Sequence, residues 1–152
     1  MIMASSQAPI LMAEDDDGDR LFFRKALEKN RVSNPLVTVA NGEELLDYLR
    51  QRGKFSNNAG QKPPCFILLD LNMPRMDGRE ALRAVKSDET LRSIPVVVLT
   101  TSKAEEDISS CYQTGANSYI TKPVDFEGLV EVVRSLKKYW LETVDLPQKA
   151  QK

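Results

Sequence analysis

Five short apolar runs alternate with segments of helical spacing, and this alternation constrains the fold more than any other feature of the chain. The runs are rich in β-branched residues and span residues 10–13, 36–39, 65–69, 95–99 and 119–120. All except the run at 36–39 lack polar alternation, which is typical of strands buried on both faces of a sheet. Because parallel strands cannot be joined by tight hairpins, helices must cross over between them. The sequence therefore predicts an α/β fold with an open parallel sheet between helices.

Residues that favour helix ends mark the expected boundaries of the helices between these runs. Asn41, Asp77 and Asp125 stand where N-caps are expected, because their side chains can accept hydrogen bonds from a first helical turn. Gly115 stands where a helix is expected to end. Residues 53–64 show no apolar periodicity and form a longer break than most connections in such folds. We expect this stretch to be a mobile surface loop.

The length and charge of the chain limit its organisation and its partners. A chain of 152 residues suits one domain, which we place at residues 8–144 with flexible termini at 1–7 and 145–152. With 21 basic and 22 acidic residues the net charge is −1, so no overall field attracts nucleic acid or a membrane surface. No stretch approaches the roughly 20 apolar residues of a membrane span, and the first residues lack a secretion signal. We therefore expect a cytoplasmic protein.

The absence of histidine excludes several kinds of site. A chain without histidine cannot form a His-based catalytic triad, a His-ligated metal site or its own phosphohistidine. Cys65 and Cys111 lie in different apolar segments and have no Cys-x-x-Cys spacing. We expect both cysteines to be small buried or half-buried side chains.

Polar residues follow four of the five predicted strands. Glu14 and Asp15 follow the first strand, Asp70 the third, Thr100 the fourth and Lys122 the fifth. The carboxyl ends of parallel strands share one edge of a sheet, so these groups should meet in one crevice. Crowded carboxylates without histidine or cysteine favour a hard cation, and Mg2+ fits a site that leaves room for waters and a phosphate. A lysine and a hydroxyl nearby would complete a phosphoryl-binding site.

Other acidic residues near the first strand have a plainer interpretation. Asp16, Asp17 and Asp19 precede or begin a predicted helix. Carboxylates in a first helical turn complement the helix dipole in solvent. We therefore interpret these three as solvated residues without a role in the site.

The order and spacing of these groups resemble the receiver domain of two-component response regulators. The resemblance covers roughly residues 8 to 140. It rests on four blocks in order, namely Glu14-Asp15, Asp70-x-Asn72-Met73-Pro74 with Met76-Asp77-Gly78, Thr100, and Lys122-Pro123. The resemblance implies a flavodoxin-like, doubly wound sheet of five parallel strands in the order 2-1-3-4-5, flanked by five helices.

The resemblance also assigns roles to the acidic residues. Asp70 is expected to be the nucleophile that takes a phosphoryl group from a sensor histidine kinase or a phosphotransfer protein. Asp15 and Asp70 would ligate Mg2+ directly, whereas Glu14 would act through an ordered water. The backbone carbonyl of Asn72 would supply a further oxygen ligand. No other cofactor is expected.

The remaining matched residues are expected to form the switch. Lys122 would pair with the phosphoryl oxygens, and Thr100 would hydrogen-bond to them after transfer. Tyr119 would then rotate inward to fill the space that Thr100 vacates. The resemblance further implies a cis peptide bond between Lys122 and Pro123, which would aim the lysine at the site.

The end of the chain bears on partners. Only 30 residues follow Lys122, so we expect a stand-alone receiver. Residues beyond 125 carry more apolar side chains than one helix face can bury, and we expect Tyr139, Trp140 and Leu141 to support a homodimer or kinase docking. The alternative is an elongated helix that covers its own sheet edge. The chain ending and the loop before Cys65 resemble those of small regulators paired with cyanobacterial phytochrome kinases, so a phytochrome is a candidate kinase.

Two other functions remain as alternatives to phosphoryl-accepting signalling. A Mg2+-dependent phosphohydrolase with an aspartyl nucleophile also places carboxylates at parallel strand ends. Such enzymes usually have an acid two residues after the nucleophile, where this chain has Asn72. A nucleotide- or flavin-binding module would need a glycine pattern that follows none of the strands. We therefore expect a signalling protein, with self-catalysed phosphotransfer and dephosphorylation only, rather than an enzyme.

Overall fold

The computed structural model describes residues 8–58 and 62–143. The predicted flexible termini, together with residue 144, lie outside the described residues. The elements follow one another as β1 (Ile10–Ala13), α1 (Asp17–Lys29), β2 (Leu36–Val39), α2 (Gly42–Arg50), the 3-10 helix η2 (Gly53–Asn58), β3 (Phe66–Leu69), α3 (Gly78–Ser87), β4 (Val96–Thr100), α4 (Glu105–Thr114), β5 (Ser118–Thr121), α5 (Phe126–Leu136) and the π-helix η3 (Lys137–Thr143).

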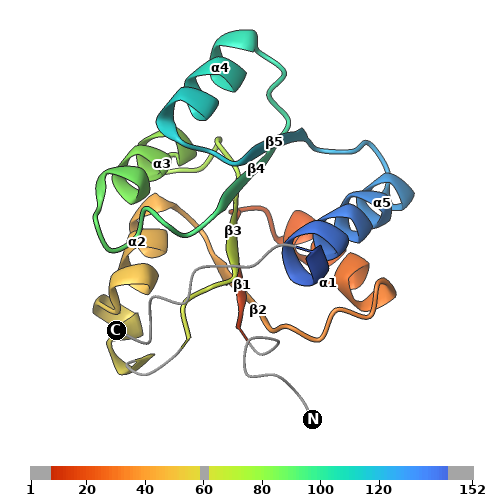
Figure 1. Ribbon diagram of the computed structural model, residues 1–152, viewed down its shortest axis with the longest axis horizontal. Helices are drawn as coiled ribbons and strands as arrows, with labels where there is room; N and C mark the ends of the chain where they lie inside the picture. Colours follow the sequence, from red (N-terminus) through yellow and green to blue (C-terminus); the bar gives the residue numbers. More distant parts are fainter. Residues whose placement is uncertain (1–7, 59–61, 144–152) are drawn as a thin grey trace.

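The five strands form one parallel sheet in the order β2-β1-β3-β4-β5, as predicted. Helices α1 and α5 cover one face of the sheet, and α2, α3 and α4 cover the other (Figure 1). Each crossover therefore returns the chain to the same end of the sheet. As a result, all strands point their carboxyl ends at one edge.

The core has two layers, one on each side of the sheet. Strands β1, β3 and β4 are buried along their whole length, which explains why their sequences lack polar alternation. Strands β2 and β5 are the edges of the sheet and are mostly half-buried. Both cysteines are free and buried, as predicted. Within the described segments, none of the helices has the length and apolar character needed to cross a membrane.

The predicted helix ends are confirmed by hydrogen bonds. Asn41 accepts from the backbone N–H of Glu44 at 2.9 Å, and Asp77 and Asp125 cap α3 and α5 in the same way. Gly115 ends α4 with a φ of 126°, a conformation that favours glycine. Short polar side chains at these positions therefore fix where the helices begin.

Residues 53–58 correct the prediction of a mobile loop. They form η2, in which the Phe55 ring packs edge-on against Tyr48 with ring centroids 5.2 Å apart. Lys54 pairs with Glu44 of α2 at 3.0 Å. The prediction of a loop was wrong for these residues because the half-buried ring of Phe55, packed against the buried Tyr48, holds a short 3-10 helix without any apolar periodicity.

The end of the chain corrects the predicted docking surface. Trp140 is only 8% exposed, and its ring lies 6.2 Å from that of Phe66 on β3. Leu141 is half-buried and packs on the same side of the core. Tyr139 is the exposed member of the three, at 52%. The π-helical turn directs Trp140 onto the core, so this part of the chain mainly covers its own sheet, as in the alternative interpretation.

Candidate metal centre

Strand pairing brings the predicted site residues to one edge of the sheet. The N–H of Asp70 donates to the carbonyl of Ala13, the last residue of β1, at 3.1 Å. Because Ala13 pairs with Leu69, the residues that directly follow these two strands, Glu14 and Asp70, lie side by side. The N–H of Lys122 donates to the carbonyl of Thr100 at 2.8 Å. Each of these residues directly follows or ends a strand. The parallel register therefore places them together, as the sequence predicted.

Glu14, Asp15 and Asp70 form an acidic cluster at this edge. Each offers a carboxylate oxygen within 4.8 Å of the others. Glu14 and Asp70 are buried, whereas Asp15 is exposed. Burial raises the pKa of Glu14, and the neighbouring Asp70 adds to that effect, while hydrogen bonds from Lys122 oppose it. An oxygen-only donor set with one open side fits a hard divalent cation, which would relieve the crowding of negative charge.

Asn72 lies in the turn that follows Asp70. Its backbone N–H donates to Asp70 Oδ1 at 3.4 Å, while its side chain is exposed. This contact ties the turn to the carboxylate that would react. The expected use of the Asn72 carbonyl as a metal ligand, and the water between Glu14 and the metal, stay predictions.

The Lys122 ammonium is shared among three carboxylates. Its Nζ lies 2.7 Å from Glu14 Oε1, 2.7 Å from Asp19 Oδ2 and 3.6 Å from Asp70 Oδ2. Burial alone would lower the pKa of Lys122, but hydrogen bonds to Asp19 and Glu14 outweigh it, and the pKa lies above its usual range. Lys122 therefore stays positively charged beside Asp70 at physiological pH.

Thr100 ends β4 beside this group and is fully buried. In the part of the chain that the structure describes, its Oγ1 has no hydrogen-bond partner. A buried hydroxyl without a partner is destabilising, so its presence needs a reason. A ligand oxygen that enters the crevice could supply the missing acceptor.

Tyr119 on β5 is half-buried and packs against the core beneath α3 and α4. Its hydroxyl donates to the carbonyl of Ser102 at 3.1 Å, in the connection that follows Thr100. The Tyr119 side chain thus contacts the connection after Thr100, whose movement is expected to let Tyr119 rotate inward. Its role as a switch stays a prediction.

The peptide bond between Lys122 and Pro123 corrects another prediction. No peptide bond within the described segments is cis, so this bond is trans. The lysine reaches the acidic groups because the pairing of β5 with β4 positions its backbone. Strand pairing therefore orients Lys122 toward the acidic residues, a role that we had expected a cis peptide bond to fill.

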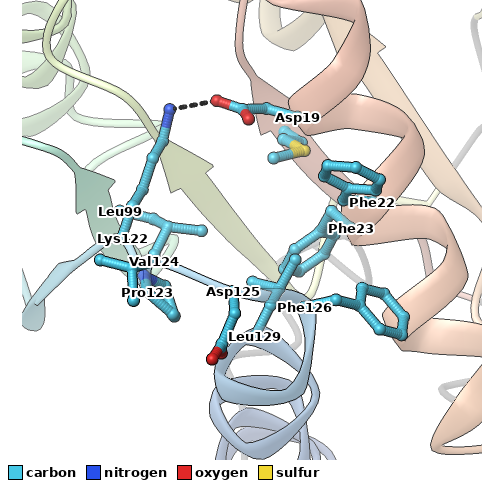
Figure 2. A pocket seen from close by; sticks show the side chains of 11 residues that line it. Asp19, Phe22, Phe23, Leu99, Lys122, Pro123, Val124, Asp125, Phe126 and Leu129 are labelled. Carbon is cyan, nitrogen blue, oxygen red and sulfur yellow. Dashed lines mark hydrogen bonds and ion pairs between the residues drawn. The ribbon is translucent and has the colours of Figure 1, made fainter.

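Two features of the site were missed in the sequence. Asp19, interpreted as solvated, contacts Lys122 from the first turn of α1 (Figure 2). Arg79 of α3 forms a bidentate ion pair with Asp107 of α4, at 2.9 and 2.7 Å, and Ser102 donates to the same carboxylate at 2.7 Å. The only available signal was position, because α1, α3 and α4 begin, and β5 ends, at the same edge of the sheet as the predicted site.

The second of these features holds the β4–α4 connection in place. Hydrogen bonds from Arg79 and Ser102 lower the pKa of Asp107 to about 2. The carboxylate therefore stays charged, and Arg79 stays bound, over the physiological range. The segment that follows Thr100 is thus fixed to both α3 and α4.

A crevice of about 180 Å³ lies beside Lys122, between α1 and the β5–α5 connection (Figure 2). We call it the α1 crevice; its wall includes Phe22, Phe23, Leu99, Pro123, Val124 and Phe126. Phe22 is half exposed and Val124 fully exposed. An apolar surface therefore adjoins the charged site.

Comparison with known proteins agrees with this geometry. Residues 10–134 match the family model described as the response regulator receiver domain. The chain is 38% identical, over 91% of its length and 92% of the relative, to the response regulator Rcp1 of Synechocystis sp.. It thus spans nearly the whole of that relative.

Two solved structures extend the comparison. The phosphorylated cyanobacterial phytochrome response regulator RcpA is similar with a TM-score of 0.85 and 43% identity, covering 93% of this chain and 99% of that one. The Mn2+-bound form of Rcp1 is similar with a TM-score of 0.83 and 37% identity, covering 92% and 99%. These likenesses confirm the predicted family and the predicted strand order.

Proposed function

Since this chain belongs to the family of response regulator receiver domains, we propose that it accepts a phosphoryl group on Asp70 from a sensor histidine kinase or a phosphotransfer protein. The observation that carries the proposal is the placement of Asp70. It is buried at a strand end, shares a possible cation site with Glu14 and Asp15, and lies 3.6 Å from Lys122. Receiver domains are signalling proteins, and the proposed reaction adds a phosphoryl group to the chain itself.

In the proposed transfer, a carboxylate oxygen of Asp70 forms a bond to phosphorus. The phosphorus–nitrogen bond to the donor histidine breaks, and its electron pair stays on the imidazole nitrogen. Lys122 stabilises the charge that develops on the phosphoryl oxygens. The product is an acyl phosphate on Asp70, which water can later cleave to restore the carboxylate.

We propose Mg2+ as the resident cation. It would be held by Asp15 and Asp70, with Glu14 acting through a water and the Asn72 carbonyl as a further ligand. When bound, the cation supplies positive charge that offsets the carboxylates and the incoming phosphoryl group. The oxygen-only donor set and the exposed position of Asp15, which leaves room for waters, support this choice. The Mn2+-bound form of Rcp1 is further support for a divalent cation.

Thr100 and Tyr119 would carry the signal away from Asp70. The Thr100 hydroxyl gains a hydrogen-bond acceptor once a phosphoryl oxygen is present, so the end of β4 moves toward Asp70. Tyr119 then turns further inward, away from the Ser102 carbonyl. The new position of the β4–α4 connection is the surface that a partner would read.

The name of one similar protein bears on the partner. RcpA is a phytochrome response regulator, and this chain is 43% identical to it. We therefore propose a phytochrome-type histidine kinase as the donor. A homodimer also stays a proposal, and its predicted surface now rests on Tyr139, because Trp140 is buried.

The test is labelling by a small phosphodonor. With acetyl phosphate and Mg2+, the wild-type chain should gain one phosphoryl group, and Asp70→Asn should gain none. Asp77→Asn is the matched control, because it removes a neighbouring carboxylate while asparagine can still cap α3. Labelling that persists in Asp70→Asn would overturn the proposal. Repeated turnover of phosphate esters would instead indicate the phosphohydrolase.

A further inference from the structure

Asp19 lies at the edge of the acceptor site but outside the acidic cluster. Its carboxylate is 2.7 Å from Lys122 Nζ, whereas the nearer Asp70 oxygen is 3.6 Å away. The Asp19 side chain is 39% exposed and that of Lys122 is 15% exposed. The lysine therefore also contacts a partly exposed carboxylate on α1 (Figure 2).

We propose that Asp19 is a positioning residue that holds the Lys122 ammonium on the α1 side of the site until a phosphoryl group on Asp70 draws it away. This inference rests on the proposed function. One ammonium serves three carboxylates, and its two short contacts are to Glu14 and Asp19 rather than to Asp70. A phosphoryl group on Asp70 would bring additional negative charge and acceptor oxygens close to the ammonium, which lies 3.6 Å from Asp70. Of these contacts, the one to Asp19 is the most exposed, so breaking it to bind a phosphoryl oxygen costs Lys122 the least free energy.

The same contact should assist cation binding. Lys122 contacts Glu14 and Asp70, two of the three carboxylates that would surround the cation. An ammonium and a divalent cation at these oxygens repel each other. Asp19 gives the ammonium a partner outside the cluster, so it lowers that competition. Without Asp19, the ammonium would move toward Glu14 and Asp70 and oppose the cation.

The contact also links the acceptor site to the α1 crevice. Asp19 and Lys122 both line the crevice, and their ion pair spans from α1 to the β5–α5 connection (Figure 2). When Lys122 moves to the phosphoryl group, this bridge breaks. Phosphorylation would therefore alter the wall of the crevice beside Phe22 and Val124.

The experiment compares Asp19→Asn with two other variants. Asp19→Glu keeps the charge and can still reach Lys122. Asp17→Asn is the matched control, because it removes a carboxylate from the same helical turn. The Asp17 side chain is 97% exposed, and its carboxylate lies 3.7 Å from Arg20, a long ion pair. Mg2+ affinity is measured by calorimetry without phosphodonor, and the labelling rate with acetyl phosphate is measured at saturating Mg2+.

Asp19→Asn should bind Mg2+ about 3- to 10-fold more weakly and, at saturating Mg2+, react about 3- to 10-fold faster, since Lys122 is no longer held back. Asp19→Glu and Asp17→Asn should stay within about twofold of wild type in both measurements. Unchanged Mg2+ affinity or a slower reaction in Asp19→Asn would overturn the inference, as would equal effects in Asp17→Asn. The Mg2+ titration needs no phosphoryl transfer, so it tests the role of Asp19 independently of labelling. If wild-type Asp70 were never labelled, that result would overturn the proposed function and not the inference about Asp19.

Discussion

Gly78→Ala should disturb the proposed acceptor site around Asp70 directly. Gly78 begins α3 and packs against the turn that follows Asp70. A Cβ at this position would lie 2.2 Å from the Asp70 carbonyl oxygen, 2.7 Å from Leu71 Cα and 2.9 Å from the Asp70 carbonyl carbon. All three are backbone atoms, so no side-chain rotation can relieve the overlap. The Gly78 N–H also donates to the Leu71 carbonyl at 3.0 Å, which holds the two segments together.

The magnitude follows from these distances. An ordinary carbon–oxygen contact is about 3.3 Å or more, so α3 and the turn after Asp70 must separate by about 1 Å. Overpacking of this kind costs about 1–3 kcal/mol, while alanine in a helix returns up to about 1 kcal/mol. We therefore expect the free energy of unfolding to fall by about 1–2 kcal/mol. Displacing the nucleophile by about 1 Å should slow phosphoryl transfer about 10- to 100-fold.

Urea denaturation measures the first quantity, and the rate of labelling by acetyl phosphate at saturating Mg2+ measures the second. Gly18→Ala is the control, since its new Cβ would meet only the Asp16 side chain, at 3.3 Å. That variant should label at the wild-type rate and be stabilised by at most about 1 kcal/mol. A Gly78→Ala protein with wild-type stability and rate would refute the reasoning that this close approach positions Asp70.

Three further variants test other parts of the structure. Thr100→Val removes the buried hydroxyl that has no partner among the described residues, so it should raise the free energy of unfolding, measured in urea, by about 1 kcal/mol. The phosphoryl label from acetyl phosphate should become shorter-lived in this variant. A destabilised variant would show that the hydroxyl is hydrogen-bonded in the folded protein. The pKa of Asp107 is lowered from 3.8 to about 2, so its ion pair stabilises the fold above pH 3.8 and loses that effect as the pH falls toward 2. Wild type and Asp107→Asn should therefore differ in thermal midpoint at pH 5 and converge near pH 2, and a constant difference would contradict the assignment. Trp140→Ala should cost about 3 kcal/mol in urea denaturation, against at most about 0.5 kcal/mol for the exposed Tyr139→Ala, and equal effects would place both rings at the surface.

The fold could be predicted closely because its central strands are buried on both faces. Such strands must be apolar throughout, so β1 and β3 stand out in the sequence as unbroken runs. The helix ends were predictable for a different reason, since caps such as Asn41 and Asp77 act within a few residues. The η2 segment depends on the packing of Phe55 against Tyr48 of the preceding helix, and the burial of Trp140 depends on its contact with Phe66 of a distant strand. The spacing of apolar residues encodes neither contact.

The candidate site divides in the same way. Glu14, Asp70 and Lys122 were predictable because each stands at the end of a recognisable strand. The contact between Asp19 and Lys122 joins residues 103 positions apart, and an acidic residue in a first helical turn is equally consistent with a solvated one. The pairing of Arg79 with Asp107 also joins separate elements, helices α3 and α4. Such contacts follow from tertiary geometry, so composition and spacing could not distinguish them from a charged surface.

The contacts around Asp70 suggest why a phosphoryl group would act as a switch here. Without one, the Thr100 hydroxyl has no partner among the described residues, and the Asn72 N–H makes only a long 3.4 Å contact with Asp70. Phosphoryl oxygens would supply acceptors to both donors and draw Lys122 from Asp19. The Arg79–Asp107–Ser102 contacts resist the accompanying movement of the β4–α4 connection, because Ser102 lies two residues after Thr100. The balance between the new contacts at Asp70 and this restraint would set the population of the switched state, so variants of Arg79 should shift that population without touching the phosphoryl group.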